Sequence, residues 1–152
     1  MKIKLFFVLV VFMITHSNSQ NDYDVLEQNL PYNKLATSFT INVVGAGESL
    51  AMYTWQKFIE KHKGTTYVIS YGEGDIELES EHVAFPLLND QLVTIHSRFS
   101  PNHTETGVMM TIWIQLSDGT YYSTKSDPES GKKIKNWLLA FHQELKQLNR
   151  TH

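Results

Sequence analysis

Four stretches with the residue patterns of β-strands follow one another between two amphipathic segments, and this arrangement limits the possible folds more than any other feature. Residues 65–71 are rich in β-branched and aromatic residues, and apolar and polar residues alternate over residues 73–85, 92–99 and 108–116. Alternation with a period of two is typical of β-strands, and connections this short favour antiparallel pairing. We therefore predict an antiparallel sheet in the middle of the chain.

The two amphipathic segments are predicted helices. Residues 48–63 carry an apolar stripe at helical spacing, and Gly64 is expected to end this helix. The second helix is expected to begin after Asp127, which can act as its N-cap, and to continue to Asn149. Its apolar positions recur at helical spacing: Ile134, Trp137, Leu138, Phe141, Leu145 and Leu148. A strand at residues 39–43 precedes the first helix.

The predicted order is β-α-β-β-β-β-α, which belongs to the α+β class. Each helix must bury one apolar face, and the simplest solution packs both on one face of a mainly antiparallel sheet. By architectural analogy, this is the TATA-binding-protein-like layout. A chain of 152 residues corresponds to one domain. We place that domain at residues 39–149, after a lead-in arm at residues 20–38.

The N-terminus has the pattern of a secretory signal. Lys2 and Lys4 precede an unbroken apolar run at residues 5–14, and a polar stretch with small residues follows. We predict a signal peptide over residues 1–19, cleaved after Ser19. A run of this length is too short to span about 30 Å of hydrocarbon. The mature protein is therefore expected to be periplasmic or secreted, without stable membrane insertion.

Composition excludes several classes of protein. The chain has no cysteine, which rules out disulfides, thiolate nucleophiles and cysteine-based metal clusters. Without Lys2 and Lys4, the mature chain carries 11 basic and 16 acidic residues. A domain with this balance lacks the positive surface that binds phosphate backbones, so we expect no nucleic-acid partner. No residue pattern calls for a cofactor.

If both helices cover one face of the sheet, the other face is open to a partner. Trp113 points to the opposite side from the apolar residues of its strand, and His96 and Arg98 alternate with apolar residues of theirs. We therefore take Trp113, Arg98 and His96 as candidate binding residues for a protein or a small ligand. The leading hypothesis is an exported, non-enzymatic binding or interaction domain that uses this face or the loop at residues 100–107.

A small serine hydrolase is the first alternative. Residues 45–51 include the pattern G-x-S-x-A, in which Ser49 follows a glycine-rich turn at the start of a helix. This pattern is close to the G-x-S-x-G elbow of hydrolases. His142 is the candidate base. No oxyanion segment accompanies Ser49, so the catalytic constellation is incomplete and we predict no catalytic residues.

A metal-binding periplasmic protein is the second alternative. His82, His96 and His103 could meet in space with Glu81, because imidazole and carboxylate groups are common metal ligands. No two of these histidines have the spacing of a helical ligand pair. We therefore name no metal ligands.

Acidic residues occupy every second position from residue 73 to residue 81. The row consists of Glu73, Asp75, Glu77, Glu79 and Glu81. On an extended segment, all five side chains point to one face. Such a row could attract a cation or a basic partner, but we favour a structural role in which like charges discourage pairing between sheet edges.

Three segments also carry a resemblance to other proteins. These are Trp55-Gln56-Lys57-Phe58 before Lys61-His62-Lys63-Gly64, then residues 110–116, and then Trp137-Leu138-Leu139-Ala140-Phe141. With these segments, the chain resembles small uncharacterised exported proteins of Bacteroidetes over residues 38–148. The resemblance implies a periplasmic or secreted protein and supplies no catalytic residues.

Overall fold

The computed structural model describes residues 25–72, 74–104 and 106–150. The predicted signal peptide lies outside these residues. The strands in this part of the chain are β1 (Leu26–Pro31), β2 (Leu35–Val44), β3 (Thr65–Tyr71), β4 (Ile76–Phe85), β5 (Gln91–Pro101) and β6 (Gly107–Gln115). The α-helices are α1 (Glu48–Lys61) and α2 (Pro128–Asn149), and short 3-10 turns lie at Pro86–Leu88 and Thr124–Ser126.

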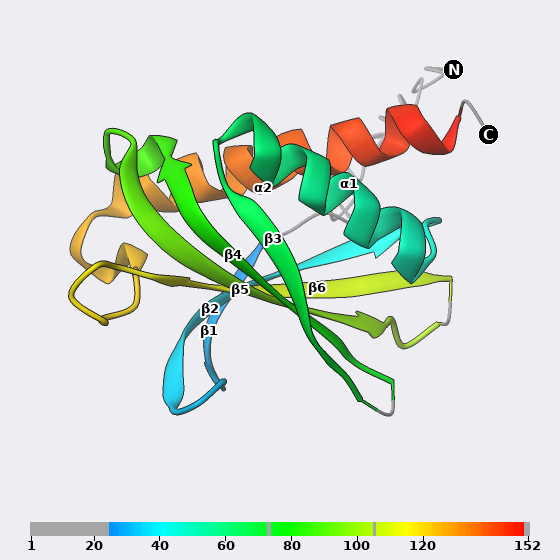
Figure 1. Ribbon diagram of the computed structural model, residues 1–152, viewed down its shortest axis with the longest axis horizontal. Helices are drawn as coiled ribbons and strands as arrows, with labels where there is room; N and C mark the ends of the chain where they lie inside the picture. Colours follow the sequence, from blue (N-terminus) through cyan, green and yellow to red (C-terminus); the bar gives the residue numbers. More distant parts are fainter. Residues whose placement is uncertain (1–24, 73, 105, 151–152) are drawn as a thin grey trace, which may run out of the picture.

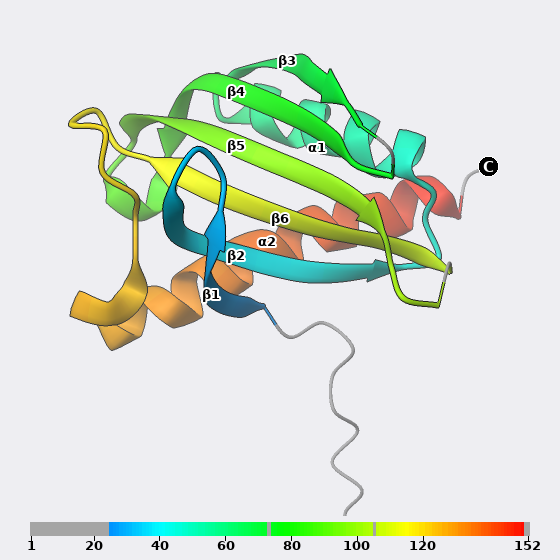
Figure 2. The same cartoon turned by 90° about the horizontal axis from the view of Figure 1, so that it is seen from below.

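The strands form one antiparallel sheet in the order β1-β2-β6-β5-β4-β3. Both helices lie on the same face of this sheet, above it in Figure 1 and behind it in Figure 2. The predicted α+β class and the order β-α-β-β-β-β-α are confirmed from β2 onward. One face of the sheet is therefore packed against the helices, and the other carries the remaining side chains.

An additional strand, β1, lies in the segment predicted as a lead-in arm. Leu26 pairs with Thr40 and Pro31 pairs with Leu35, so residues 26–31 form a hairpin with β2. Apolar and polar residues do not alternate in β1. This edge strand is held by backbone pairing and buries little apolar surface of its own, so its position in the sheet does not require alternation. In Figure 1 the tip of the hairpin extends away from the helices.

The core lies between the sheet and the two helices. Trp55 is fully buried at its centre, 5.2 Å from Phe141 and 5.8 Å from Trp137 between ring centroids, both in edge-on arrangements. Such aromatic pairs contribute about 0.5–1.5 kcal/mol each beyond the area that they bury. The sheet contributes its alternate apolar residues, including Ile95 and Ile112. The periodicity of both helices is therefore explained by this one core.

The start of α2 and the end of α1 are stabilised in different ways. Asp127 caps α2 as predicted, because its side chain accepts a hydrogen bond from the backbone nitrogen of Glu129 at 3.0 Å. After α1, however, the left-handed residue is Lys63 (φ 66°) and not Gly64. A Cβ at Gly64 would lie 2.6 Å from Cγ2 of Ile59 and 2.7 Å from Cγ2 of Val83. Gly64 is therefore needed for close packing after the helix and not for a positive φ.

The acidic row lies on an interior strand. Glu77, Glu79 and Glu81 belong to β4, whereas Asp75 precedes the strand and Glu73 lies outside the described residues. The sheet edges are β1 and β3, and β4 lies between β3 and β5. The expected role in protecting a sheet edge is therefore wrong.

None of the helices in the described part of the chain is long and apolar enough to cross a membrane.

Candidate functional site

A cluster of polar and aromatic side chains occupies the sheet face opposite the helices. We call it the polar face, and it consists of Glu77, Glu79 and Glu81 from β4, Thr94, His96 and Arg98 from β5, and Thr111, Trp113 and Gln115 from β6. These residues alternate with the core residues of the same strands, so period two places them all on one side. The three candidate binding residues Trp113, Arg98 and His96 are thus neighbours on the predicted face.

The β1–β2 hairpin covers part of the polar face. The ring of Tyr32 stacks on His96 at 4.3 Å and lies 5.3 Å from Trp113 between centroids. Trp113 donates a hydrogen bond from Nε1 to the carbonyl oxygen of Leu30 at 3.2 Å. As a result, Trp113 is fully buried and His96 is only 5% exposed. The expectation that Trp113 lies open to a partner is wrong, because the unpredicted hairpin covers it.

Arg98 is bound on two sides within the polar face. Its Nε and Nη2 atoms lie 2.8 Å and 2.6 Å from Oε1 of Glu77. Its guanidinium group also lies over the Trp113 ring, 5.1 Å from the centroid. Because the charge is already paired with a carboxylate and an aromatic face, Arg98 holds the face together and offers little charge to an anionic ligand.

His96 links a carboxylate to an amide across the sheet. Its Nδ1 atom lies 3.1 Å from Oε2 of Glu79, at ion-pair distance but without hydrogen-bond alignment. Its Nε2 atom lies 3.3 Å from Oε1 of Gln115. Both ring nitrogens therefore face acceptor oxygens, and the stacked Tyr32 ring fixes the imidazole from above.

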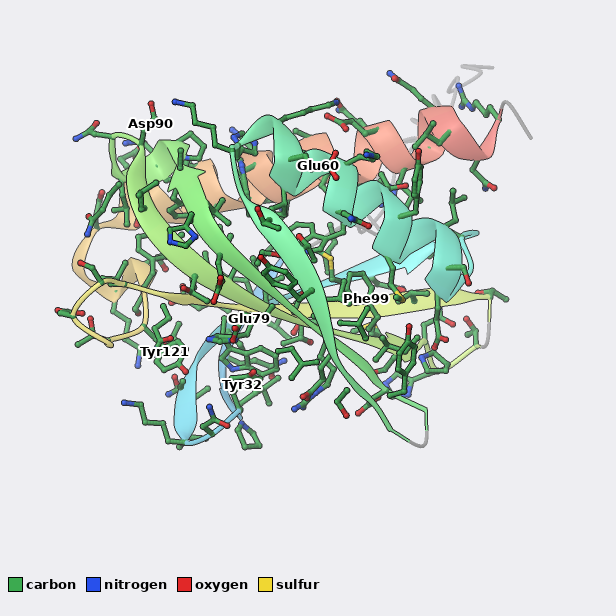
Figure 3. The ribbon with its side chains drawn as sticks, viewed as in Figure 1. Tyr32, Glu60, Glu79, Asp90, Phe99 and Tyr121 are labelled. Carbon is green, nitrogen blue, oxygen red and sulfur yellow. The ribbon has the colours of Figure 1, made fainter. Side chains whose placement is uncertain are left out.

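Tyr32 is held as a neutral phenol. Burial raises the pKa of Tyr32 above its usual value, and the nearby carboxylates of Glu77 and Glu79 raise it further, while Arg98 opposes them. Figure 3 shows Tyr32 and Glu79 on the side of the sheet away from the helices, with Tyr121 close by. The hairpin therefore covers the polar face with an uncharged group at neutral pH.

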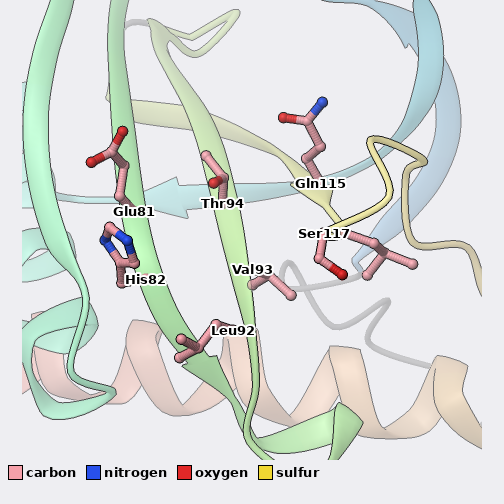
Figure 4. A pocket seen from close by; sticks show the side chains of 8 residues that line it. Glu81, His82, Leu92, Val93, Thr94, Gln115 and Ser117 are labelled. Atoms are coloured by element: carbon pink, nitrogen blue, oxygen red, sulfur yellow. The ribbon is translucent and has the colours of Figure 1, made fainter.

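A cavity of about 170 Å³ adjoins this cluster. Its lining residues are Glu81, His82, Leu92, Val93, Thr94, Gln115, Leu116 and Ser117 (Figure 4). Gln115 belongs both to the cavity and to the His96 contact. Sites for drug-sized ligands enclose roughly 300–1,000 Å³, so this cavity suits a group the size of one side chain.

A bulge in β4 shapes the cavity. The pairing with β5 shifts between Ser80 and Val83, so Glu81 and His82 stand opposite Thr94 alone. His82 has a φ of 56°, an uncommon conformation for a residue other than glycine. Bulges redirect side chains, and here Glu81 and His82 both line the cavity. The alternation of apolar and polar residues in the sequence does not predict this bulge.

The alternative sites of the sequence analysis do not assemble in the described residues. Ser49 lines a cavity of about 250 Å³ between α1 and β3, and none of the described residues that line it is a histidine. His142 is 2% exposed on the core side of α2. Among the described residues, no group of three or more histidine, aspartate or glutamate side chains could hold a metal ion, so His82, His96 and His103 do not form a metal site.

The loop after β5 is organised by Asn102, which is 5% exposed. Its Oδ1 atom accepts hydrogen bonds from the backbone nitrogen of Thr106 at 3.0 Å and from Oγ1 of Thr104 at 3.2 Å. Its Nδ2 atom donates to Oδ1 of Asn42 at 3.2 Å. The loop at residues 100–107, the other candidate binding region, is thus tied to β2 through one side chain.

Replacing Asn102 with alanine is expected to lower the free energy of unfolding by about 1–3 kcal/mol, because the partner groups lose their hydrogen bonds. Urea unfolding of the variant measures this loss. The exposed neighbour His103 provides the control, since His103→Ala should change stability by less than about 0.5 kcal/mol. Equal effects of the two substitutions would contradict the assigned role of Asn102.

Comparison of the chain with protein-family models, with curated proteins and with solved structures gave no match. The case for function therefore rests on the geometry of the polar face and its cavity.

Proposed function

We propose that this protein is an exported, non-enzymatic binding domain that takes a cationic group of its partner into the cavity beside Glu81. The cationic group is an amine or a guanidinium of a small ligand or a peptide side chain. One observation carries the proposal: a carboxylate without an ion-pair partner among the described residues lies in a polar cavity of side-chain size.

The charge distribution supports a cationic ligand. The one arginine on the polar face is already paired with Glu77, and Glu79 contacts His96. Glu81 is the third carboxylate of the polar face and has no ion-pair partner among the described residues. Thr94 and Gln115 line the same cavity with a hydroxyl group and an amide, and the amide oxygen of Gln115 also contacts His96. A cation that enters this cavity would exchange water for the charged carboxylate of Glu81, which forms the stronger kind of hydrogen bond.

Two further observations support binding over catalysis and export over an internal location. The incomplete Ser49 motif has no histidine among the described residues of its cavity, which removes the best candidate for a nucleophile with its base. The charged start, apolar run and polar end of residues 1–19 have the order of a secretory signal. Both parts of the proposal are open to direct tests.

Calorimetric titration with matched peptides tests the binding proposal. The probes are short acetylated tripeptides with a central lysine or arginine, and their neutral controls carry norleucine or citrulline. We expect the cationic peptides to bind and the neutral peptides to bind at least tenfold more weakly. Added salt should also weaken binding, because the charged group sits at a partly exposed site.

Glu81→Gln provides the matched variant. Removing a charge-assisted hydrogen bond costs about 1.5–3 kcal/mol, so affinity for the lysine peptide should fall by roughly tenfold or more. Glu129→Gln removes an exposed carboxylate on α2 and should leave affinity unchanged. Equal affinity of wild type and Glu81→Gln, or equal binding of charged and neutral peptides, would overturn the proposal.

A further inference from the structure

His82 lines the same cavity as Glu81 and can carry a positive charge of its own. Both residues belong to the bulge of β4, where the pairing with β5 shifts between Ser80 and Val83. Successive residues of a regular strand point to opposite faces of a sheet, but these two both line the cavity. Figure 4 shows the two side chains projecting from β4, with the imidazole ring beside the stem of Glu81. The bulge thus places a group that can bind a proton beside the carboxylate.

The backbone conformation of His82 sets it apart from the rest of the sheet. Among the described residues, His82 alone has a positive φ inside a strand, at 56°. This left-handed conformation is uncommon for residues other than glycine, asparagine and aspartate. Residues held in such conformations occur preferentially at ligand sites and switches. The position of His82 in a cavity is consistent with a role of this kind.

We propose that His82 makes the binding of a cation at Glu81 depend on pH. This inference rests on the proposed function, because it concerns the same cavity and the same carboxylate. While the imidazole is neutral, the carboxylate of Glu81 is the charge that the ligand meets. Once the imidazole is protonated, its positive charge offsets that of the carboxylate and repels the cation. Acid therefore releases the ligand.

The pH changes the protein side of this contact and leaves the ligand unchanged. Histidine is the side chain that ordinarily changes its charge between about pH 5 and pH 8, whereas lysine and arginine keep theirs over this range. His82 is exposed, so protons from the solvent reach it directly.

The groups that surround His82 on the neighbouring elements do not supply the same change of charge. The lining residues on β5, β6 and the turn after β6 are uncharged: Leu92, Val93, Thr94, Gln115, Leu116 and Ser117. Before β3, the carbonyl oxygen of His62 accepts a hydrogen bond from the backbone nitrogen of Ala84 at 2.8 Å, so Lys63 lies beside the bulge. A lysine adds a constant positive charge there. The ring of His62 packs instead against Phe58 and Trp137.

His96 is the other histidine of the polar face, and its effect must be separated from that of His82. It is 5% exposed beneath Tyr32 and lies between Glu79 and Gln115. Among the described residues, it does not belong to those that line the cavity. A substitution of His82 alone therefore distinguishes the two histidines.

Calorimetric titration with the lysine tripeptide at about pH 8 and about pH 5.5 tests the inference. We expect the wild type to bind about fivefold more weakly at the lower pH, the effect of one repelling charge in a largely aqueous setting. His82→Asn removes the proton-binding group, and asparagine tolerates a positive φ, so the bulge is kept. This variant should bind equally well at both pH values. His103→Asn changes an exposed histidine of the loop after β5 and should retain the pH dependence of the wild type.

The outcomes separate this inference from the proposed function. Equal affinity of the wild type at both pH values overturns the inference and leaves the cation site intact. The inference is also overturned if His82→Asn retains the pH dependence, because the titrating group then lies elsewhere. Absence of binding at pH 8 overturns the proposed function, and this inference with it. Wild type and variants share His142, so any effect of acid on overall stability is common to all three.

Discussion

Replacing Gly107 with alanine is expected to destabilise the protein by about 3 kcal/mol, near the upper end for overpacked sites. Gly107 begins β6 and pairs with Val44 of β2. A Cβ at this position would lie 2.1 Å from the carbonyl oxygen of Val43 and 2.9 Å from Cα of Val44. Both contacts are with backbone atoms, so no side chain can move aside and the two strands must separate. Urea unfolding measures the loss.

Gly131 supplies the matched control for this prediction. It lies within α2, and the nearest atom to an added Cβ is Oγ1 of Thr124 at 4.0 Å. Alanine is favoured over glycine inside helices, so Gly131→Ala should stabilise the protein by about 0.5–1 kcal/mol. The two glycine substitutions are therefore expected to have opposite signs. Similar losses in both variants would contradict the packing argument at Gly107.

The protein is expected to lose about 2 kcal/mol of stability between pH 7.5 and pH 5 through the titration of His142. Burial, together with the charge of Lys146, lowers the pKa of this side chain from 6.5 to about 4 in the folded protein. Below pH 6.5 the unfolded chain therefore binds the proton more strongly than the folded chain does. The contribution of His142 to the free energy of unfolding is therefore fully present above pH 6.5 and decreases as the pH falls toward 4.

His62 contributes to the same pH dependence. Burial lowers the pKa of His62, against the opposing effect of Glu144 and Asp90. Its Nε2 atom accepts a hydrogen bond from Nε1 of Trp137 at 3.3 Å, and a protonated imidazole cannot accept it. Acid is thus expected to weaken the contact between the end of α1 and α2.

His142→Leu separates the effect of His142 from the other groups. Leucine cannot bind a proton, so the variant should show a clearly smaller loss of stability between pH 7.5 and pH 5 than the wild type. The comparison uses urea unfolding at each pH, and only the slope with pH is compared. Identical slopes for wild type and variant would show that His142 does not titrate as described.

Much of the fold is predictable because its periodic elements each bury one face in a single core. The helix beginning at Glu48 and the strand Thr65–Tyr71 agree with the structure, as does Asp127 as the cap of α2. The same reasoning could not predict the strand β1. It is stabilised by pairing with β2, and neither alternation nor β-branched residues mark the segment LEQNLP.

The candidate site was predictable in part for the same reason. Alternation correctly places Trp113, His96 and Arg98 on the face opposite the helices. It cannot show that Tyr32 covers two of them, since that contact depends on the unpredicted hairpin. It also misses the cavity, because the bulge at His82 interrupts the alternation on which the prediction rests.

The most direct test of the binding proposal is a map of where a cationic ligand contacts the protein. Amide spectra of ¹⁵N-labelled mature protein are recorded during titration with the lysine tripeptide and, separately, with its norleucine control. The proposal predicts shifts concentrated at Glu81, Thr94 and Gln115 with the lysine peptide alone, and their loss in Glu81→Gln. Shifts confined to other surfaces, or none at millimolar peptide, a concentration on the order of the weakest specific affinities, would contradict it.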